Sequence, residues 1–400
     1  MTHHPQMNCN FRLRKLVALM LVIALLTTVA YEAFVISFRN MVIDEGQLVV
    51  SDAVQFEQNH SLANIHYQFR RRLPGFRSVN HIGCLYSSNI HFLAFFSEVE
   101  TIWMCGIAGT PKLDPLRHCR NLREFSCPDS DIFDLQPLQN CSSLRKLEIP
   151  GSIVTDVTSL KHNKKLEYLD LSRTKLESLT PLAGLGNLAE LHLSGASLKD
   201  WSSLSSLCQL RKLDLAGSNF SDSSLLGSLK QLTSLNIAGT RVDNLNSLTT
   251  LTNLSHLDIR ETEVRDFSAL SNLPQLESLA IQINCTTPRD LAKQLATLSE
   301  NDLPRLLELT IRVSGPIEEF EGRVDDIAST AKLTLDLSDT FICEDHELPI
   351  RRPNTHLILN LHAGPNRKDW PHISYTWGRP RSQDGNIRDQ WMPYYELQQY

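Results

Sequence analysis

The sequence predicts an α/β solenoid bent into an arc, with a parallel β-sheet on its concave side. Three observations lead to this prediction. The same apolar positions recur every 22 residues through the middle of the 400-residue chain, and a fixed period of this length is typical of solenoids. Each period opens with apolar residues at alternate positions, which indicates a short strand with one buried face. A further leucine, sixteen residues after the start, supplies the opposite wall of the core.

The strand segment keeps an unbroken register. Eight successive periods begin with leucine, at Leu122, Leu144, Leu166, Leu188, Leu210, Leu232, Leu254 and Leu276. A degenerate copy is predicted to open at Glu100, which would place Cys105 and Cys127 on the same core strand position. Longer periods follow, and we expect about twelve rungs between residues 100 and 361.

The second half of each period predicts a capped helical turn. The residue twelve positions after the start is Asp134, Asp156, Ser178, Asp200, Asp222, Asn244 or Asp266. A short side-chain oxygen at this position can accept the free backbone N–H groups that open a helical turn. Eight positions after the start, Ser or Thr in most copies can satisfy backbone groups inside the bend. Asn163 and Ser223 occupy leucine positions, which predicts looser packing in those copies.

The combined pattern, Leu-x-x-Leu-x-Leu/Ile-x-x-Ser/Thr-x-Leu/Val-x-Asp-Leu-x-x-Leu-x-x-Leu, resembles the 22-residue leucine-rich repeat of the internalin type over roughly residues 100–297. The resemblance implies an arc-shaped fold that recognises a partner, but no partner-contacting residue can be carried over from it. Many internalin-type repeats have Asn where this chain mostly has Ser or Thr, and Ala196 has no polar side chain at this position. This departure argues against a continuous side-chain ladder there.

The amino terminus predicts an export or anchoring segment. Three basic residues, Arg12, Arg14 and Lys15, precede an apolar stretch at residues 16–38 that is long enough to span a bilayer. An uncleaved signal-anchor is favoured over a signal peptide cleaved after Ala30. In both cases the rest of the chain lies outside the cytoplasmic membrane, either as a single-pass membrane protein or as a secreted one.

Four segments follow from these assignments. They are 1–38, a cytoplasmic stub and signal-anchor helix; 39–99, a juxtamembrane linker and amino-terminal cap; 100–362, the repeat domain; and 363–400, a carboxy-terminal cap or tail. The repeat domain divides into regular repeats at 100–297 and longer repeats at 298–362. In the longer periods, helices are expected after Pro288 and Pro316 because proline suits the first turn.

Composition and motifs exclude several functional classes. A net charge of −6 leaves no basic footprint for nucleic acid. The sequence has no zinc-site cysteine spacing and no recognised catalytic or phosphate-binding motif, so we expect no catalytic residues, no cofactor and no metal. Four cysteines in two pairs 22 residues apart, Cys105 with Cys127 and Cys119 with Cys141, are interpreted as small buried hydrophobic residues, with a disulfide between stacked neighbours left as an alternative.

The concave face is therefore where partner-binding residues are expected. Equal repeat positions of stacked strands form columns, and two columns, with one residue just beyond them, supply the candidates. The candidates are Lys146, Glu148, Tyr168, Asp170, Glu190, His192, Lys212, Asp214, Asn236, His256, Asp258 and Arg260.

His192 would lie between Asp170 and Asp214, so we expect a raised pKa for its imidazole. A cation held by these three residues is less favoured because the two carboxylates lie two rungs apart. The favoured function is non-catalytic binding of a protein or glycan through this face. The alternatives are a structural self-associating envelope protein and, a distant third, a hydrolase.

Overall fold

The computed structural model describes most of the repeat region and parts of both flanks. The described residues are 41–44, 47–51, 80–85, 93, 98–105, 111–284, 294, 303–316, 332–341, 355–359, 373–378 and 392–396. The predicted signal-anchor at 16–38 and the predicted helices after Pro288 and Pro316 lie outside these ranges, except that Gln294 is helical. Within the described ranges, no helix has the length and apolar character needed to cross a bilayer.

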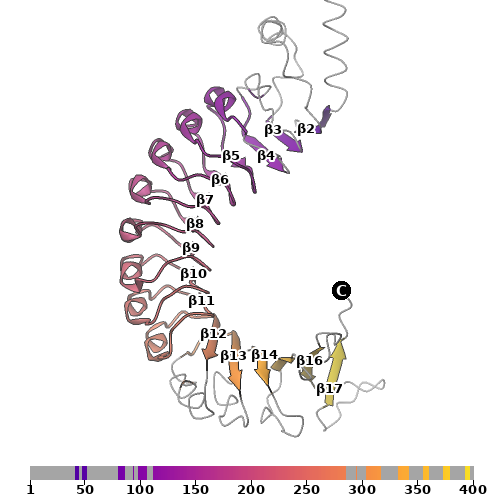
Figure 1. Ribbon diagram of the computed structural model, residues 1–400, viewed down its shortest axis with the longest axis vertical. Coiled ribbons are helices and arrows are strands. Elements are labelled where there is room, and N and C mark those ends of the chain that lie inside the picture. Colours follow the sequence, from indigo (N-terminus) through magenta and orange to yellow (C-terminus); the bar gives the residue numbers. More distant parts are fainter. Residues whose placement is uncertain are drawn as a thin grey trace, which may run out of the picture.

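The chain coils into an arc whose strands line the concave side and whose short 3-10 turns stand on the convex side (Figure 1). The strands are β1 (Met41–Asp44), β2 (Gln47–Ser51), β3 (His81–Leu85), β4 (Thr101–Cys105), β5 (Glu124–Ser126), β6 (Lys146–Glu148), β7 (Tyr168–Asp170), β8 (Glu190–His192), β9 (Lys212–Asp214), β10 (Ser234–Asn236), β11 (His256–Ile259), β12 (Ser278–Asn284), β13 (Glu308–Pro316), β14 (Lys332–Phe341), β15 (Thr355–Leu359), β16 (Ile373–Gly378) and β17 (Met392–Glu396). The turns are η4 (Asp114–His118), η5 (Gln136–Asn140), η6 (Thr158–His162), η7 (Thr180–Leu182), η8 (Ser202–Ser206), η9 (Ser223–Ser228), η10 (Asn246–Thr250) and η11 (Ser268–Asn272).

Neighbouring strands pair in chain order to form one sheet. From β2 to β15 every pairing is parallel, as expected when each strand returns through one coil to lie beside the last. Antiparallel pairings of β1 with β2, and of β16 with β15 and β17, lie at the two ends. Strands β2 and β3 therefore bring part of the segment predicted as linker and cap into the parallel sheet.

The first repeat opens one residue earlier than predicted. Thr101 pairs with Glu124 and Ile102 with Phe125, so the equivalent of Leu122 is Val99 rather than Glu100. Val99 and Met104 are both fully buried, and Met104, rather than the predicted Cys105, occupies the core strand position. The repeat between Val99 and Leu122 has one additional residue, which a strict 22-residue count places in the wrong register.

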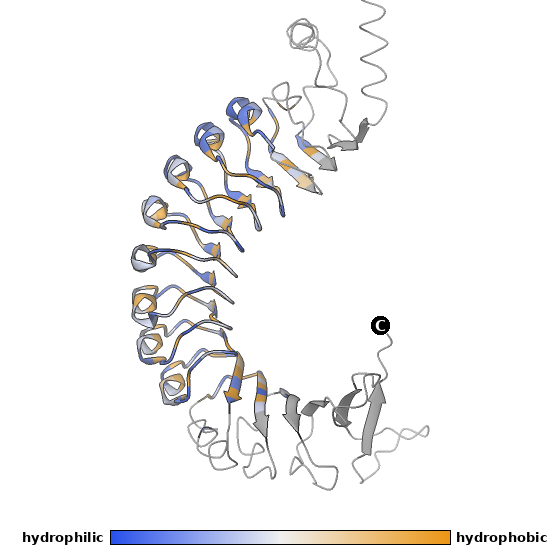
Figure 2. Cartoon of the chain, viewed as in Figure 1, coloured by the Kyte–Doolittle hydropathy of each residue, from blue (hydrophilic) through white to orange (hydrophobic). Residues whose placement is uncertain are grey.

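The core is one continuous column of apolar side chains. Strands such as β7 bury their central leucine between two partly exposed residues, because successive side chains point to opposite faces. Leu166, Leu169 and Leu182, from the start, strand and turn of one repeat, are all fully buried. Figure 2 shows hydrophobic and hydrophilic residues mixed along the strands and turns of the regular coils in the middle of the arc.

The predicted caps are confirmed in six of the seven copies. The side-chain oxygens of Asp134, Asp156, Ser178, Asp200, Asp222 and Asp266 accept from the backbone N–H two residues later, at 2.7–3.1 Å. In most copies the capping residue lies one position before the residue that flanks the 3-10 turn. Asn244 instead accepts a hydrogen bond from the hydroxyl of Ser223.

The hydroxyls inside the bend act within their own rung. Thr174 Oγ1 donates to the Leu171 carbonyl at 2.5 Å, and Thr240 and Thr262 make the equivalent bond three residues back. The Ser152 hydroxyl is buried without a partner. These bonds do not run from rung to rung, which agrees with the expected lack of a continuous ladder at this position.

A ladder does exist elsewhere, and it corrects the prediction of loose packing at Asn163. Asn163 is fully buried, and its Nδ2 donates to the carbonyls of Leu138 (3.0 Å) and Cys141 (2.9 Å) in the previous rung. One rung earlier, the Cys141 thiol points at the Leu116 carbonyl at 3.4 Å. The polar side chain thus fixes two rungs together instead of loosening them.

The buried cysteines are thiols, as expected of small core residues. Burial raises the pKa of Cys141 to about 12, and burial together with the neighbouring Cys141 raises that of Cys119 to about 12. Both thiols are therefore protonated, and hence poor nucleophiles, at physiological pH. Cys119 and Cys141 do not form the disulfide that was the alternative for these stacked neighbours.

Candidate functional site

Parallel pairing brings the predicted concave-face residues together in two columns across β6 to β11. Lys146, Tyr168, Glu190, Lys212 and His256 lie in one column, and Glu148, Asp170, His192, Asp214, Asn236 and Asp258 in the other. Arg260 lies just past the end of β11. The predicted set thus forms one contiguous surface, because the sheet keeps the same register over all these strands.

Two aromatic rings stand at the centre of this surface. The Tyr168 and His192 rings are 5.0 Å apart and tilted by 34°. Lys146 Nζ lies 4.9 Å from the centroid of the Tyr168 ring, within the range of a cation–π contact. The cluster therefore links three successive strands through side chains that are only partly exposed.

Carboxylates surround the two rings and shift their titration. Asp214 Oδ2 lies 3.9 Å from His192 Nδ1, and Glu190 Oε2 lies 3.9 Å from Nε2. Asp214 is the main cause of a raised pKa for His192, with Asp170 and Glu190 adding to it and partial burial opposing it. Burial, together with Asp170, Glu148 and Glu190, raises the pKa of Tyr168 to about 12, so its hydroxyl stays protonated. The prediction of a raised His192 pKa is confirmed.

Several charges on this face are already neutralised. Lys146 pairs with Glu148 at 2.9 Å and Lys212 with Glu190 at 2.9 Å. The Arg260 guanidinium makes a two-point contact with Asp258, with its shortest distance at 2.6 Å. Asp170 and Asp214 have no lysine or arginine within ion-pairing distance among the described residues, so the negative charge is concentrated around His192.

The second column also has a structural use that sequence reasoning missed. The side-chain oxygens of Asp170, Asp214, Asn236 and Asp258 each accept from the backbone N–H two residues later, at 2.9–3.1 Å. Each hydrogen bond stabilises the turn that follows its strand, as Asp and Asn side chains commonly do. A partner would therefore meet only the remaining oxygen or amide group of Asp170, Asp214 and Asn236, whereas the remaining oxygen of Asp258 already accepts from Arg260.

Trp103 is the concave-face residue that the sequence did not reveal. It pairs with Gly83 on one side and Ser126 on the other, in the column that contains Asp170 and His192. Because both neighbours are small, the indole stands free and is 46% exposed. Counting the first repeat from Val99 instead of Glu100 would have placed it there.

Comparison with known proteins supports the fold. No family model matches the sequence, and no curated protein matches it. Among solved structures, an internalin (inlF) of Listeria monocytogenes is 22% identical, with 73% of this chain and 86% of that chain covered and a TM-score of 0.52. A leucine-rich repeat protein of Leptospira interrogans is 19% identical, with 71% and 72% covered and a TM-score of 0.55. The chain folds as a leucine-rich repeat solenoid.

The concave face of this leucine-rich repeat solenoid presents several kinds of side chain that a partner could contact. It combines aromatic rings, paired charges and a negative patch on a wide, curved sheet. No group of three or more His, Cys, Asp or Glu within the described ranges is arranged to hold a metal ion. Such a surface suits recognition of a macromolecule, because an aromatic side chain contributes contact area and a charged one contributes selectivity.

Proposed function

We propose that this leucine-rich repeat protein is a non-catalytic binding protein that recognises a protein partner through its concave face. The observation that carries the proposal is the alignment of Trp103, Tyr168 and His192 on one side of a single sheet. Aromatic residues dominate the binding energy of most protein interfaces. Here they are exposed or half-buried, with acidic groups around the central pair.

The chemistry of the face favours a partner with a basic or hydrogen-bond-donating segment. Asp170 and Asp214 flank His192, and His192 Nε2 is buried with no hydrogen-bond partner. Because that nitrogen is buried, a partner would contact Asp170 and Asp214 rather than the imidazole nitrogen itself. An apolar group of the same partner would cover the exposed Trp103 ring.

We place this binding domain outside the cytoplasmic membrane, tethered by residues 16–38. Three basic residues before an apolar stretch of membrane-spanning length support this location. Cell fractionation with amino-terminal sequencing of the mature protein tests it. A mature chain that starts after Ala30 would instead identify a secreted protein, and an intact chain in the soluble cytoplasmic fraction would exclude both locations.

Partner capture tests the concave face directly. The full chain, a Trp103→Ser/Tyr168→Ser variant and a Phe133→Ser/Ile153→Ser variant would each be cross-linked to proteins on the surface of the native host cell. Phe133 and Ile153 are exposed apolar residues outside the concave strands, so they control for general stickiness. We expect the same cross-linked proteins with the full chain and the control, and their loss with the first variant. Equal capture by all three would contradict the proposal.

A further inference from the structure

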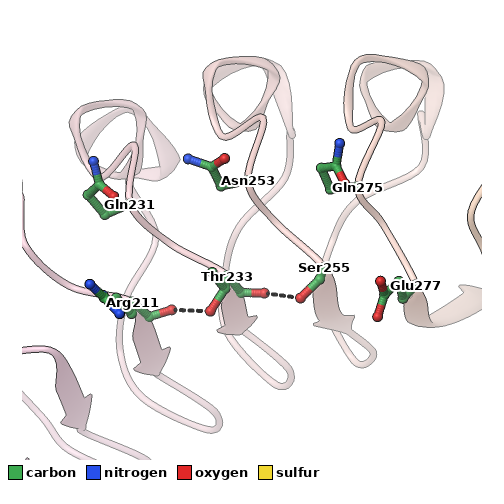
Figure 3. A pocket seen from close by; sticks show the side chains of 7 residues that line it. All are labelled: Arg211, Gln231, Thr233, Asn253, Ser255, Gln275 and Glu277. Carbon is green, nitrogen blue, oxygen red and sulfur yellow. Dashed lines mark hydrogen bonds between the residues drawn. The ribbon is translucent and has the colours of Figure 1, made fainter.

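A shallow groove runs along the flank of the solenoid, where the 3-10 turns return to the strands. It crosses the rungs of β9 to β12 and has a volume of about 360 Å³ (Figure 3). Its lining consists of Arg211, Gln231, Thr233, Asn253, Ser255, Gln275 and Glu277. Every lining side chain is polar, and none is aromatic. None of the lining residues belongs to the set assigned to the concave face, and the two surfaces meet at Ser255, whose Oγ lies 2.8 Å from His256 Nδ1.

Two repeat positions build the groove. Gln231, Asn253 and Gln275 each come directly before the first leucine of a repeat, so their carboxamides form one row at successive rungs. The residue directly after that leucine forms a second row, as Figure 3 shows for Arg211, Thr233, Ser255 and Glu277. A linear ligand that follows the solenoid would meet both rows at each rung.

Hydrogen bonds within the wall hold the groove but leave several polar atoms available. Thr233 Oγ1 donates to the Arg211 carbonyl at 3.1 Å, and Ser255 Oγ donates to the Thr233 carbonyl at 3.0 Å. Asn253 Nδ2 donates to the Lys230 carbonyl at 3.0 Å, which leaves its Oδ1 as an acceptor. The Gln275 Oε1 accepts from Arg305, which leaves its Nε2 as a donor.

The two ends of the groove hold opposite charges. Among the described residues, neither the Arg211 guanidinium nor the Glu277 carboxylate makes an ion pair, and the rungs of β10 and β11 lie between the two residues. The same repeat position behaves differently earlier in the chain, where Arg123 pairs with Glu100 at 3.1 Å and Arg145 pairs with Glu167. Charged residues at this repeat position can thus pair between adjacent rungs. Arg211 and Glu277 do not, because the adjacent rungs of the groove present no opposite charge at this position.

We propose that the groove binds an oligosaccharide, with Arg211 and Glu277 at its ends and the carboxamide row between them. Guanidinium, carboxamide and carboxylate groups are planar and present two hydrogen-bonding atoms side by side, which matches pairs of neighbouring sugar hydroxyls. A peptide would need apolar or aromatic anchors, and the lining provides none. A drug-like apolar ligand is disfavoured for the same reason.

The test compares two matched charge deletions in the full chain. Arg211→Ala/Glu277→Ala removes the charges at the groove ends. Arg123→Ala/Glu167→Ala removes the same two residue types at the same repeat position outside the groove. An array of neutral and uronic-acid-containing oligosaccharides identifies the best-bound sugar, and isothermal titration with that sugar measures its affinity for each protein.

We expect the groove variant to bind the sugar at least about tenfold more weakly, since charged hydrogen bonds are lost, and the control variant to bind it like the unmodified chain. Trp103→Ser/Tyr168→Ser should leave sugar binding unchanged, which separates this proposal from the concave-face one. Urea unfolding midpoints check that each variant is folded. The proposal is overturned if the unmodified chain binds no sugar on the array, if both charge deletions weaken binding equally, or if the groove captures only peptides from a parallel peptide array.

Discussion

The first half of the regular array, from β4 to β7, joins adjacent rungs through polar groups in the core and ion pairs on the flank, whereas in the second half, from β8 to β12, the equivalent core position is leucine and the flank residues Arg211 and Glu277 make no ion pair among the described residues. The position three residues before each repeat start shows this in the core. It is Cys119, Cys141 and Asn163 in the first half, and Leu185, Leu207, Leu229, Leu251 and Leu273 in the second. Both sets are buried. The first set holds rungs together by hydrogen bonds or thiol contacts, and the second by apolar packing.

The flank shows the same contrast. Arg123 and Arg145 each pair with a glutamate on an adjacent rung, while Arg211 and Glu277 remain apart at the ends of a groove. Adjacent rungs can therefore be joined either by hydrogen bonds and ion pairs or by apolar packing. Where apolar packing joins them, the charged groups on the flank remain available to a ligand. Substitutions in matched pairs, one from each half, test whether this division is real.

The largest effects are expected in the core column. Leu229→Ala should lower the free energy of unfolding by about 3 kcal/mol because a fully buried side chain leaves a cavity. Asn163→Leu should lower it by about 2 kcal/mol, although it adds an apolar side chain to the core, because two hydrogen bonds to the previous rung are lost. Urea unfolding followed by circular dichroism measures both. A gain of stability in Asn163→Leu would show that this position is merely an imperfect leucine site.

A smaller effect is expected inside the bends. Thr174→Val keeps the shape of the side chain but removes the bond to the Leu171 carbonyl, so we expect a loss of about 1 kcal/mol. Ser152 occupies the same repeat position without a hydrogen-bond partner, so Ser152→Ala should be neutral or slightly stabilising. Unfolding midpoints of the two variants decide this. Equal losses at both positions would mean that the hydroxyl bond contributes nothing specific.

The contribution of His192 to the stability of the fold should depend on pH. His192 lies on β8, the first strand of the second half. Because its folded pKa is raised above the ordinary value near 6.5, protonation stabilises the fold. This contribution is fully present below about pH 6.5 and disappears as the pH rises through the folded pKa. His192→Gln should therefore lose more stability in acid than in mild alkali.

An NMR titration of the His192 imidazole gives the pKa itself, and Asp214→Asn should lower it because that carboxylate is the main cause of the shift. A folded pKa at or below the ordinary value, or a His192→Gln effect that does not change with pH, would contradict the electrostatic description of the cluster.

The smallest effects are expected on the flank. Arg145→Ala breaks an exposed ion pair and should cost less than about 1 kcal/mol, with the loss reduced further by salt. Arg211→Ala breaks no ion pair with the part of the chain that the structure describes, so it should leave stability unchanged. A double-mutant cycle of Arg145 with Glu167 isolates the pair energy. Destabilisation by Arg211→Ala would show that this residue supports the fold, and it would weaken the assignment of the groove as a binding site.

The concave columns were predictable from spacing, whereas the roles of their residues were not. Any strict repeat places Asp170, His192 and Asp214 side by side, so the raised pKa of His192 followed from the sequence. The backbone bond made by each aspartate did not, because it depends on the conformation at the end of the strand. Trp103 was missed because one additional residue in the first repeat moves the register, and only strand pairing reveals that shift.

The sequence by itself determined the coil, its period, its capped turns and its apolar core, because those features repeat within a single 22-residue unit and need only local geometry and burial. Only the tertiary structure decided whether a buried polar residue such as Asn163 joins two rungs, and whether a flank arginine is paired or open to a groove. Those outcomes depend on which side chain the adjacent rung presents, and that is a contact between residues about 22 positions apart rather than a property of one repeat.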